Sequence, residues 1–246
     1  MSDETGPVAL VVGGASGIGA ALVGAYRAAG TPTVVWDVAG TRDVTCDVAD
    51  PGAVDAAVED TRQRWGVPSQ VTVTAGVGHA GLLTEIEPEE FDRVLRVNTR
   101  GPLLCMRAWA RVMQAEQLAG SFVAVSSVSA RLVDRSMGVY CASKAALSML
   151  VQVAAAEWGA DGLRVNAVAP GVTTTPMLGR GASAQSSPWL AGVARRTALG
   201  RLGEGEDIAP VIQALHSMSW VTGQVLECDG GLALRSPIDT YSALEG

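Results

Sequence analysis

The segment that decides the fold is Val8-Ala9-Leu10-Val11-Val12-Gly13-Gly14-Ala15-Ser16-Gly17-Ile18-Gly19. Its first part is apolar and β-branched, as expected of a strand that is buried on both faces. The glycines follow at once and open an alanine-rich stretch that predicts a helix near 17–29. Glycine lets the backbone approach a ligand closely, and a helix N-terminus attracts a pyrophosphate. We therefore predict that a dinucleotide is bound by Gly13, Ser16, Gly17, Ile18 and Gly19; a purely structural glycine-rich turn is the alternative.

The rest of the chain repeats this alternation of short apolar strands and amphipathic stretches. Such a pattern is typical of βαβ units around a parallel sheet. No linker, repeat or break in composition divides the 246 residues, so we expect one α/β domain, 1–246. The expected strands are Val8–Val12, Thr33–Trp36, Asp43–Cys46, Gln70–Thr74, Gly120–Val125, Leu163–Val168 and Val225–Glu227. The expected helices lie near 17–29, 51–65, 89–117, 138–159 and 206–216.

Asp37 ends the second predicted strand and indicates which dinucleotide is preferred. A carboxylate there can accept hydrogen bonds from ribose hydroxyls and repels a 2′-phosphate. No basic residue stands in the glycine turn or just after Asp37, so the sequence favours NAD over NADP. The link from Asp37 to Asp47 is too short for a helical crossover, and we expect a tight non-helical loop there.

Lys144 is the only lysine of the chain and follows Tyr140 by four residues, in Tyr-Cys-Ala-Ser-Lys. Positions i and i+4 share one face of a helix, so the phenol and the ammonium can enter one pocket. A nearby cation favours the phenolate, and we expect it to lower the pKa of Tyr140 toward neutrality. The pair predicts a general acid or base; a chance spacing is the alternative.

Bulk properties exclude several classes of function. The net charge of −7 argues against a nucleic-acid partner, and no run of 18 apolar residues predicts a membrane span. The four cysteines are scattered along the chain, and the two histidines do not belong to a metal-binding motif. We therefore expect neither a disulfide framework nor a metal site. The N-terminus lacks a signal-peptide pattern, and a cytoplasmic protein is expected.

Gly-x-x-x-Gly-Ile-Gly together with Tyr-x-x-x-Lys resembles the short-chain dehydrogenase/reductase family, over about Val8 to Leu232. The resemblance implies a single-domain, doubly wound Rossmann-type fold with a seven-stranded parallel sheet. It also implies a homo-oligomer, a tetramer or a dimer, built on the helices near 100–117 and 138–158.

The same resemblance assigns further residues. Asn98 would hold a water of a proton relay, and Ser127, thirteen positions before Tyr140, would be the catalytic serine, with Ser126 beside it. The cofactor would be contacted by Asp47, Val48, Ala75, Gly76, Pro170, Gly171, Thr173 and Thr175, besides Tyr140 and Lys144. Ser127 could instead only end a strand, and Asn98 could only satisfy backbone groups inside a helix.

The chain departs from the family pattern at three points. Val12 replaces a usual threonine, Val73-Thr74 replaces a usual Asn-Asn, and Thr173 replaces a common Ile or Val. Thr74 is expected to substitute in part for the missing amide. None of the departures touches the predicted catalytic residues.

The expected activity is NAD-dependent interconversion of a secondary alcohol and its ketone. An apolar wall predicts a hydrophobic or alicyclic substrate; it comprises Val77, Leu82, Leu132, Val133, Met137, Met177, Leu178, Trp189 and Leu190. Arg131, Arg135 and Arg180 leave a carboxylate-bearing substrate open. Segment 177–199 is expected to be a mobile loop over the substrate, with Trp189 either on the substrate or in ordinary packing.

Three other functions stay open at this point. Two are enzymatic, reduction of a 3-oxoacyl thioester and oxidation of a cyclic dihydrodiol. The third is a catalytically silent NAD-binding regulator. His79 is expected to be a surface-loop residue and His216 a structural one.

Overall fold

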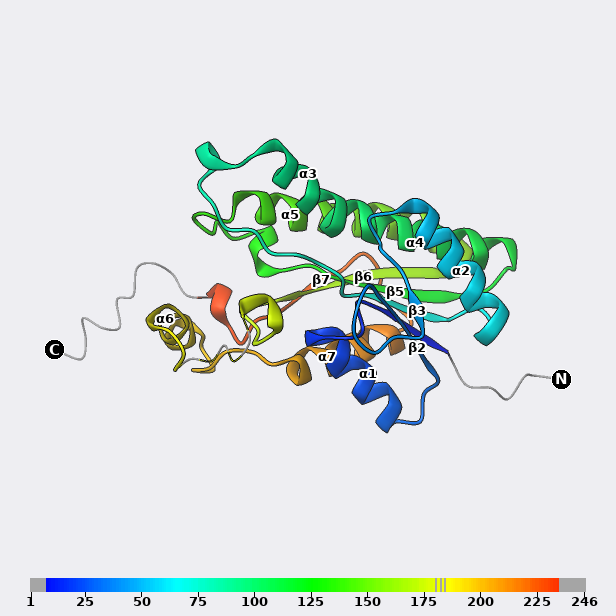
Figure 1. Cartoon of the computed structure of the whole chain (residues 1–246). Coiled ribbons are helices and arrows are strands. Elements are labelled where there is room, and N and C mark those ends of the chain that lie inside the picture. Colours follow the sequence, from blue (N-terminus) through cyan, green and yellow to red (C-terminus); the bar gives the residue numbers. More distant parts are fainter. Residues whose placement is uncertain (1–7, 180, 182, 184, 235–246) are drawn as a thin grey trace.

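Seven parallel strands form one sheet in the computed structural model, which describes residues 8–179, 181, 183 and 185–234 (Figure 1). The strands run in the spatial order β3-β2-β1-β4-β5-β6-β7. Their bounds are β1 (Ala9–Val12), β2 (Thr33–Asp37), β3 (Val44–Thr45), β4 (Gln70–Val73), β5 (Gly120–Val125), β6 (Leu163–Pro170) and β7 (Val225–Cys228). The predicted single-domain, doubly wound fold is confirmed, because the sheet is continuous and every pairing is parallel.

Helices cover both faces of the sheet (Figure 1). Helices α1 (Gly17–Ala28) and α7 (Gly205–Ser217) bury one face together with apolar side chains of β1 and β6. Helices α2 (Pro51–Trp65), α4 (Gly101–Ala115) and α5 (Gly138–Trp158) bury the other. Burial on both faces explains why β1 is apolar at every position. The remaining helical segments are α3 (Pro88–Leu95), α6 (Pro188–Arg196), η1 (Leu83–Glu85), η2 (Arg96–Arg100), η3 (Val128–Ala130), η4 (Gly159–Asp161), η5 (Pro176–Leu178) and η6 (Leu232–Leu234).

The strand order reverses between β1 and β4, and this reversal positions the site. The chain leaves β1 toward one side of the sheet and leaves β4 toward the other, so the connections diverge at the carboxyl ends of these strands. A crevice for a ligand forms at such a reversal point. The glycine turn after β1 and the Thr74–Gly76 segment after β4 both border it.

The connection from β2 to β3 contains no helix, as expected. Strand β3 is only two residues long and pairs Trp36 with Val44 and Asp37 with Thr45. The loop is held from within, because the Asp43 carboxylate accepts a hydrogen bond from Val35 N at 2.9 Å. Asp43 N also donates to Val35 O at 2.9 Å, so Asp43 holds the loop against β2 through two groups.

Two helical expectations were incomplete. The stretch near 89–117 is not one helix: it comprises α3, a π-helical turn at η2, and α4. A π turn inserts an extra residue into the helical ladder and is common at functional sites; here it contains Asn98. Segment 177–199, expected to be a loop, contains the amphipathic helix α6, whose Leu190 and Ala194 pack against Leu202.

Helix α5 and the turn that follows it, Gly138–Asp161, are long and apolar enough to cross a membrane by length and composition alone. No run of 18 apolar residues marks it in the sequence, because polar residues interrupt every apolar run. In the fold the helix lies against β6, and Leu147, Val151 and Ala154 are part of the core. Its apolar character is therefore explained by packing on the sheet.

His216 on α7 is buried against the sheet, with 4% of its surface exposed, and its side chain contacts two strands. Its Nε2 lies 2.9 Å from Thr72 Oγ1 of β4, and its Nδ1 lies 3.0 Å from Ser121 Oγ of β5. Burial, and secondarily the charge of Arg164, lower the pKa of His216 to about 3. The imidazole is thus a neutral structural bridge, in agreement with the sequence expectation.

We predict that His216 makes stability depend on pH. Below about 6.5 the unfolded chain takes up a proton that the folded chain refuses until pH about 3. Stability is therefore lost as pH falls through this window, by up to about 1.4 kcal/mol per pH unit from this group. Urea unfolding at pH 7, 6 and 5 should show a shallower loss for His216→Gln than for the wild type. Parallel pH dependences of the two proteins would contradict the assignment.

Candidate active site

The glycine turn after β1 packs tightly against the loop after β4 and leaves the start of α1 open. Gly13 has φ +84° and Gly17 φ +52°, conformations that disfavour any side chain. A Cβ on Gly13 would lie 2.6 Å from Ala75 N and 2.8 Å from Thr74 Oγ1. Ser16, at the start of α1, makes no side-chain cap, so the first amide groups of the helix stay available to an anion.

Thr74 supports the turn from the end of β4. Its Oγ1 lies 3.0 Å from Val12 O and 2.9 Å from Gly13 O, so one hydroxyl is shared between the two carbonyls at the end of β1. This fixes the turn relative to Ala75 and Gly76. The expectation that Thr74 substitutes for an amide side chain agrees with these contacts.

Asp37 lies at the cavity with its carboxylate already oriented. Its Oδ2 accepts a hydrogen bond from Ala15 N at 3.0 Å, and its Oδ1 accepts one from Val38 N at 2.8 Å. The carboxylate is thereby fixed beside the glycine turn, where its remaining lone pairs can accept hydroxyl donors. Arg42 is engaged within its own loop, because its guanidinium donates to Gly40 O at 2.9 Å and to Thr45 Oγ1 at 2.8 Å.

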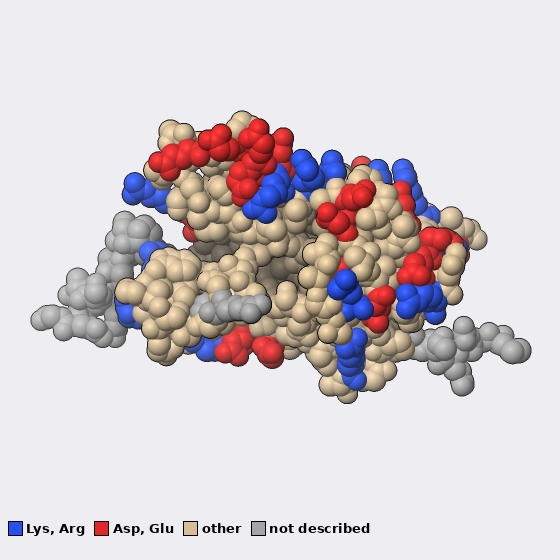
Figure 2. Space-filling model, in the orientation of Figure 1, with Lys and Arg blue, Asp and Glu red and all other residues tan. Residues whose placement is uncertain are grey.

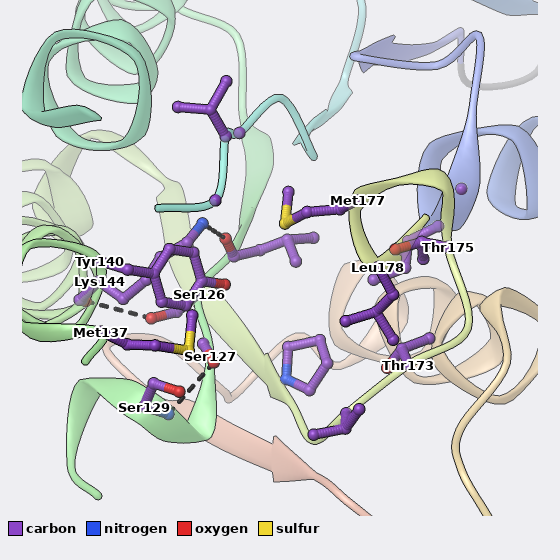
Figure 3. A pocket seen from close by; sticks show the side chains of 18 of the residues that line it. Ser126, Ser127, Ser129, Met137, Tyr140, Lys144, Thr173, Thr175, Met177 and Leu178 are labelled. Carbon is purple, nitrogen blue, oxygen red and sulfur yellow. Dashed lines mark hydrogen bonds between the residues drawn. The ribbon is translucent and has the colours of Figure 1, made fainter. Parts of the chain in front are cut away.

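Tyr140 and Lys144 project from the same face of α5 into one cavity, as their spacing predicted (Figure 3). Lys144 is 3% exposed, and its Nζ lies 5.8 Å from the centroid of the Tyr140 ring. The ammonium donates a hydrogen bond to Val125 O of β5 at 2.9 Å. Among the described residues it has no carboxylate partner, so burial lowers the pKa of Lys144 to about 8.

The expected lowering of the Tyr140 pKa is not found in the ligand-free chain. Burial raises the pKa of Tyr140 above its ordinary value, and the charges of Cys141 and Asp134 raise it further. The Ser127 hydroxyl, within hydrogen-bonding reach, acts in the opposite direction. The Lys144 ammonium does not offset this rise: it is directed at the Val125 carbonyl, and with a pKa of about 8 it has lost its charge in the pH range where the phenol titrates. Desolvation therefore outweighs the attraction that the sequence suggested.

The two neighbouring serines after β5 have different surroundings. Ser126 turns toward α5, where its Oγ lies 2.8 Å from Ser148 Oγ and 3.2 Å from Lys144 O. Ser127 faces Tyr140 and also accepts a hydrogen bond from Ser129 N at 3.1 Å, which caps η3. Ser127 thus has both the structural role and the position next to the phenol that were alternatives from the sequence.

Asn98 lies completely buried behind the cavity, in the π turn. Its amide clamps the backbone of one residue: Val77 N donates to Oδ1 at 2.8 Å, and Nδ2 donates to Val77 O at 2.9 Å. A Cβ on Gly76 would lie 3.3 Å from Asn98 Oδ1 and 3.5 Å from Lys144 Nζ, so this glycine lets both side chains approach. Asn98 satisfies backbone groups as one interpretation expected, but those of the loop after β4 rather than of its own helix.

All the predicted cofactor residues line a single cavity of about 1910 Å³. A typical small-molecule pocket measures about 300–1000 Å³, so this one has room for a dinucleotide and a substrate. Figure 2 shows the hollow in the surface between the two helical layers. The lining includes Gly13, Ser16, Gly17, Ile18, Gly19, Asp37, Asp47, Val48, Ala75, Gly76, Pro170, Gly171, Thr173 and Thr175, together with Ser127, Tyr140 and Lys144.

These residues fit a nicotinamide dinucleotide by their chemistry. The uncapped start of α1 suits a pyrophosphate, and the fixed Asp37 carboxylate suits a ribose diol. The Lys144 ammonium, aimed into the cavity with one carbonyl partner, has donors left for a second ribose. No group of three or more metal-ligating side chains occurs within residues 8–179, 181, 183 and 185–234.

Apolar side chains line the cavity on both sides: Figure 3 shows Met137 beside Ser127 and Tyr140, and Met177 and Leu178 across from them. The apolar lining of the cavity comprises, as expected, Val77, Leu132, Val133, Met137, Met177, Leu178 and Trp189. Leu82 and Leu190 do not line it: Leu82 is exposed, and Leu190 is buried against α6 neighbours. Trp189 lies on the cavity with 59% of its surface exposed, which favours a role at the substrate over ordinary packing.

The arginine expectations are only partly met. Arg131 is engaged by Glu227 at 2.6 Å and does not line the cavity, whereas Arg135 does. Arg180 lies outside the described residues. Arg196 also lines the cavity, and it was not expected there.

Two polar residues of the cavity were not singled out from the sequence. Ser129 and Asp134 lie between Ser127 and Tyr140 in the chain, and both line the cavity. His79, expected to be a surface-loop residue, lines it as well, with Nδ1 2.9 Å from Glu90 Oε1. The Ser-x-Ser pattern at 127–129 was visible in the sequence, but only the fold shows that both serines face the same space.

A family model described as enoyl-(acyl carrier protein) reductase matches residues 13–233. Two relatives span nearly the whole chain. A 3alpha-hydroxysteroid dehydrogenase of Mediterraneibacter gnavus is 32% identical, over 91% of this chain and 95% of its own. A 2,5-dichloro-2,5-cyclohexadiene-1,4-diol dehydrogenase of Sphingobium indicum is 34% identical, over 94% and 98%.

A solved structure with the same fold is that of a gluconate 5-dehydrogenase from Burkholderia cenocepacia, described in complex with NADP and tartrate. Its TM-score is 0.87 and its sequence is 27% identical. The match covers 94% of this chain and 96% of that one. The likeness therefore extends across the whole sheet and its helices.

We predict that Lys144 destabilises the fold that holds it. Below pH 8 it is charged in both states, so burial of the charge opposes folding in full; the penalty fades as pH rises from about 8 to 10.5. Lys144→Met should raise the free energy of unfolding at pH 7 by roughly 1–3 kcal/mol, and this gain should shrink by pH 9.5. Urea unfolding at both pH values measures it. A variant less stable than wild type at pH 7 would contradict the prediction.

Proposed function

The chain belongs to the short-chain dehydrogenase/reductase family, and from this we propose that it is an NAD-dependent oxidoreductase interconverting a secondary alcohol and its ketone. Membership makes it an enzyme that acts on CH–OH groups. The observation that carries the proposal is the convergence of Tyr140, Lys144 and Ser127 on one cavity with the glycine turn and Asp37.

The chemistry divides between the cofactor and the side chains. A bound nicotinamide dinucleotide would supply the two-electron acceptor that receives hydride from the alcohol carbon. Tyr140 Oη, when deprotonated, takes the alcohol proton; in the reverse direction the phenol returns a proton to the carbonyl oxygen. Ser127 Oγ donates a hydrogen bond to the substrate oxygen. The substrate oxygen is thereby oriented between the hydroxyl groups of Ser127 and Tyr140.

The supporting residues act on position and charge. Lys144 holds ribose hydroxyls through its free donors. Below pH about 8 it is protonated and places a positive charge beside the phenol. Asn98 fixes the loop after β4 through both backbone groups of Val77, so the cavity floor stays in place. We propose that Asn98 also connects Lys144 to solvent through water.

The substrate proposal follows from the apolar wall. Leu132, Val133, Met137 and Trp189 offer contact to a hydrophobic or alicyclic skeleton rather than to a charged chain. Two relatives carry names that specify cyclic alcohols, a steroid and a cyclohexadiene diol, which supports the same class.

We further propose a cytoplasmic homo-oligomer, a tetramer or a dimer. All four cysteines are free, as is usual in a reducing compartment. On α5, Met149 and Val153 leave 59% and 44% of their surface exposed, which supports a contact between copies. Light scattering in solution measures the assembly.

Tyr140→Phe tests the catalytic role. Removing the hydroxyl should lower kcat for alcohol oxidation by about 10²–10⁴-fold. The affinity for NADH, measured by fluorescence, should change by only a few-fold because the ring remains. Phe91→Tyr, which adds a hydroxyl on an exposed side chain outside the cavity, serves as a control and should leave both values unchanged. An unaltered kcat in Tyr140→Phe would refute the role.

Asp37 tests the cofactor preference. The wild type should use NAD over NADP by more than about tenfold in kcat/KM, about 1.4 kcal/mol. Asp37→Ala should reduce that ratio several-fold, since the carboxylate no longer repels a 2′-phosphate. Steady-state rates with both cofactors decide it. Equal use of NADP by the wild type would show that Asp37 does not select the cofactor.

A further inference from the structure

Ser129 and Asp134 form a hydrogen-bonded polar pair among the apolar side chains that line the cavity. Ser129, 8% exposed, belongs to η3, and Asp134 lies in the turn that leads to α5. Ser129 Oγ donates a hydrogen bond to Asp134 Oδ2 at 2.5 Å. Leu132, Val133 and Met137 surround the pair along the chain and line the same cavity.

The pair is one hydrogen bond away from the residue that orients the reacting oxygen. Ser129 N donates to Ser127 Oγ at 3.1 Å, and Figure 3 shows Ser129 next to Ser127 on the Tyr140 side of the cavity. The charge of Asp134 also reaches Tyr140, since it contributes to raising the pKa of that phenol. Ser127, the pair and Tyr140 therefore border the same part of the cavity, so the pair lies close to the proposed position of the reacting oxygen.

The pair offers hydrogen-bond acceptors to a ligand, so the ligand group that binds it must be a donor. A carboxylate only accepts, and the Ser129 hydroxyl already donates its one hydrogen bond to Asp134, so free acceptor positions remain on both. Among the described residues Asp134 has no Arg or Lys ion partner. A carboxylate on an apolar wall is favoured only when donors satisfy it. Arg135 and Arg196 line the same cavity and disfavour an ammonium, which leaves a neutral hydroxyl.

We infer that Ser129 and Asp134 bind a second hydroxyl, carried by the carbon next to the reacting one. The preferred substrates are then vicinal diols on an alicyclic skeleton, and the products are α-hydroxyketones. In each turnover one C–OH is oxidised, its hydride passing to NAD and its proton to Tyr140, while the second hydroxyl stays intact. The inference rests on the proposed function and names its substrate class.

The test compares cyclohexanol with cis- and trans-1,2-cyclohexanediol, oxidised by the full chain with NAD at a pH where each variant has reached its maximal rate. The wild type should prefer one of the diols by about tenfold or more in kcat/KM. Cyclohexanol has no second hydroxyl, so it leaves the acceptors of Ser129 and Asp134 without a hydrogen-bond donor. Asp134→Ala should remove most of that preference, mainly through the KM of the diol. The loss in kcat/KM should be at least about threefold greater for the preferred diol than for cyclohexanol.

Two further variants separate binding from folding. Asp134→Asn keeps the size of the side chain and should lose part of the preference; Ser129→Ala removes the donor to Asp134 and should do the same. Asp92→Asn makes the same change of charge on an exposed helix position outside the cavity, and should leave both substrates unaffected.

The possible failures are distinguishable. Equal kcat/KM for cyclohexanol and both diols in the wild type, or equal losses on all substrates in Asp134→Ala and Asp134→Asn, would overturn the inference and leave the proposed function standing. No oxidation of any of the three alcohols with NAD or NADP would overturn the proposed function, and the inference with it.

Discussion

The site depends on a buried ammonium that has no carboxylate partner. Lys144 is fixed by a single carbonyl, that of Val125 at the end of β5, and burial draws its pKa down to about 8. An isolated buried cation is destabilising, so the surrounding fold must be stable enough to hold it. The residual donors of the ammonium then face the cavity, where a polyhydroxyl ligand can satisfy them. Lys144 therefore lowers the stability of the fold at the place where we propose that the cofactor binds and Tyr140 transfers a proton.

Polar side chains behind the cavity hold its walls in register. Thr74 ties the end of β4 to the carbonyls at the end of β1, and Asn98 holds the next loop through Val77. Both act on backbone groups, and Asn98 Nδ2 also donates to Ser143 Oγ at 3.1 Å. Because the glycine turn and the loop after β4 leave adjacent strands in different directions, such ties are what keeps them together. After β5, the Ser127 side chain likewise accepts a hydrogen bond from the backbone N–H of Ser129. This bond caps η3 and holds that part of the cavity lining in place.

Several features were predicted well because they depend on local pattern. The strands, the glycine turn, the short link after Asp37 and the Tyr140–Lys144 face follow from residue periodicity and spacing. The π turn at Asn98 was not foreseen, since periodicity continues smoothly through it. The direction of the Tyr140 pKa was wrong, because spacing shows that a cation is near but not how deeply both groups are buried. Arg131 was misplaced for a similar reason, since its partner Glu227 is far away in sequence.

The sequence by itself determined the fold class, the family and the residues around which the site is built. Those signals are short-range: hydrophobic period, glycine position and i, i+4 spacing are written in consecutive residues. Only the tertiary structure decided which side chains share the cavity with Tyr140. Ser129 and Asp134 come to face that space because η3 and the following turn fold back against α5. Burial, hydrogen-bond partners and the resulting proton affinities arise from contacts between distant segments, and no local pattern records them.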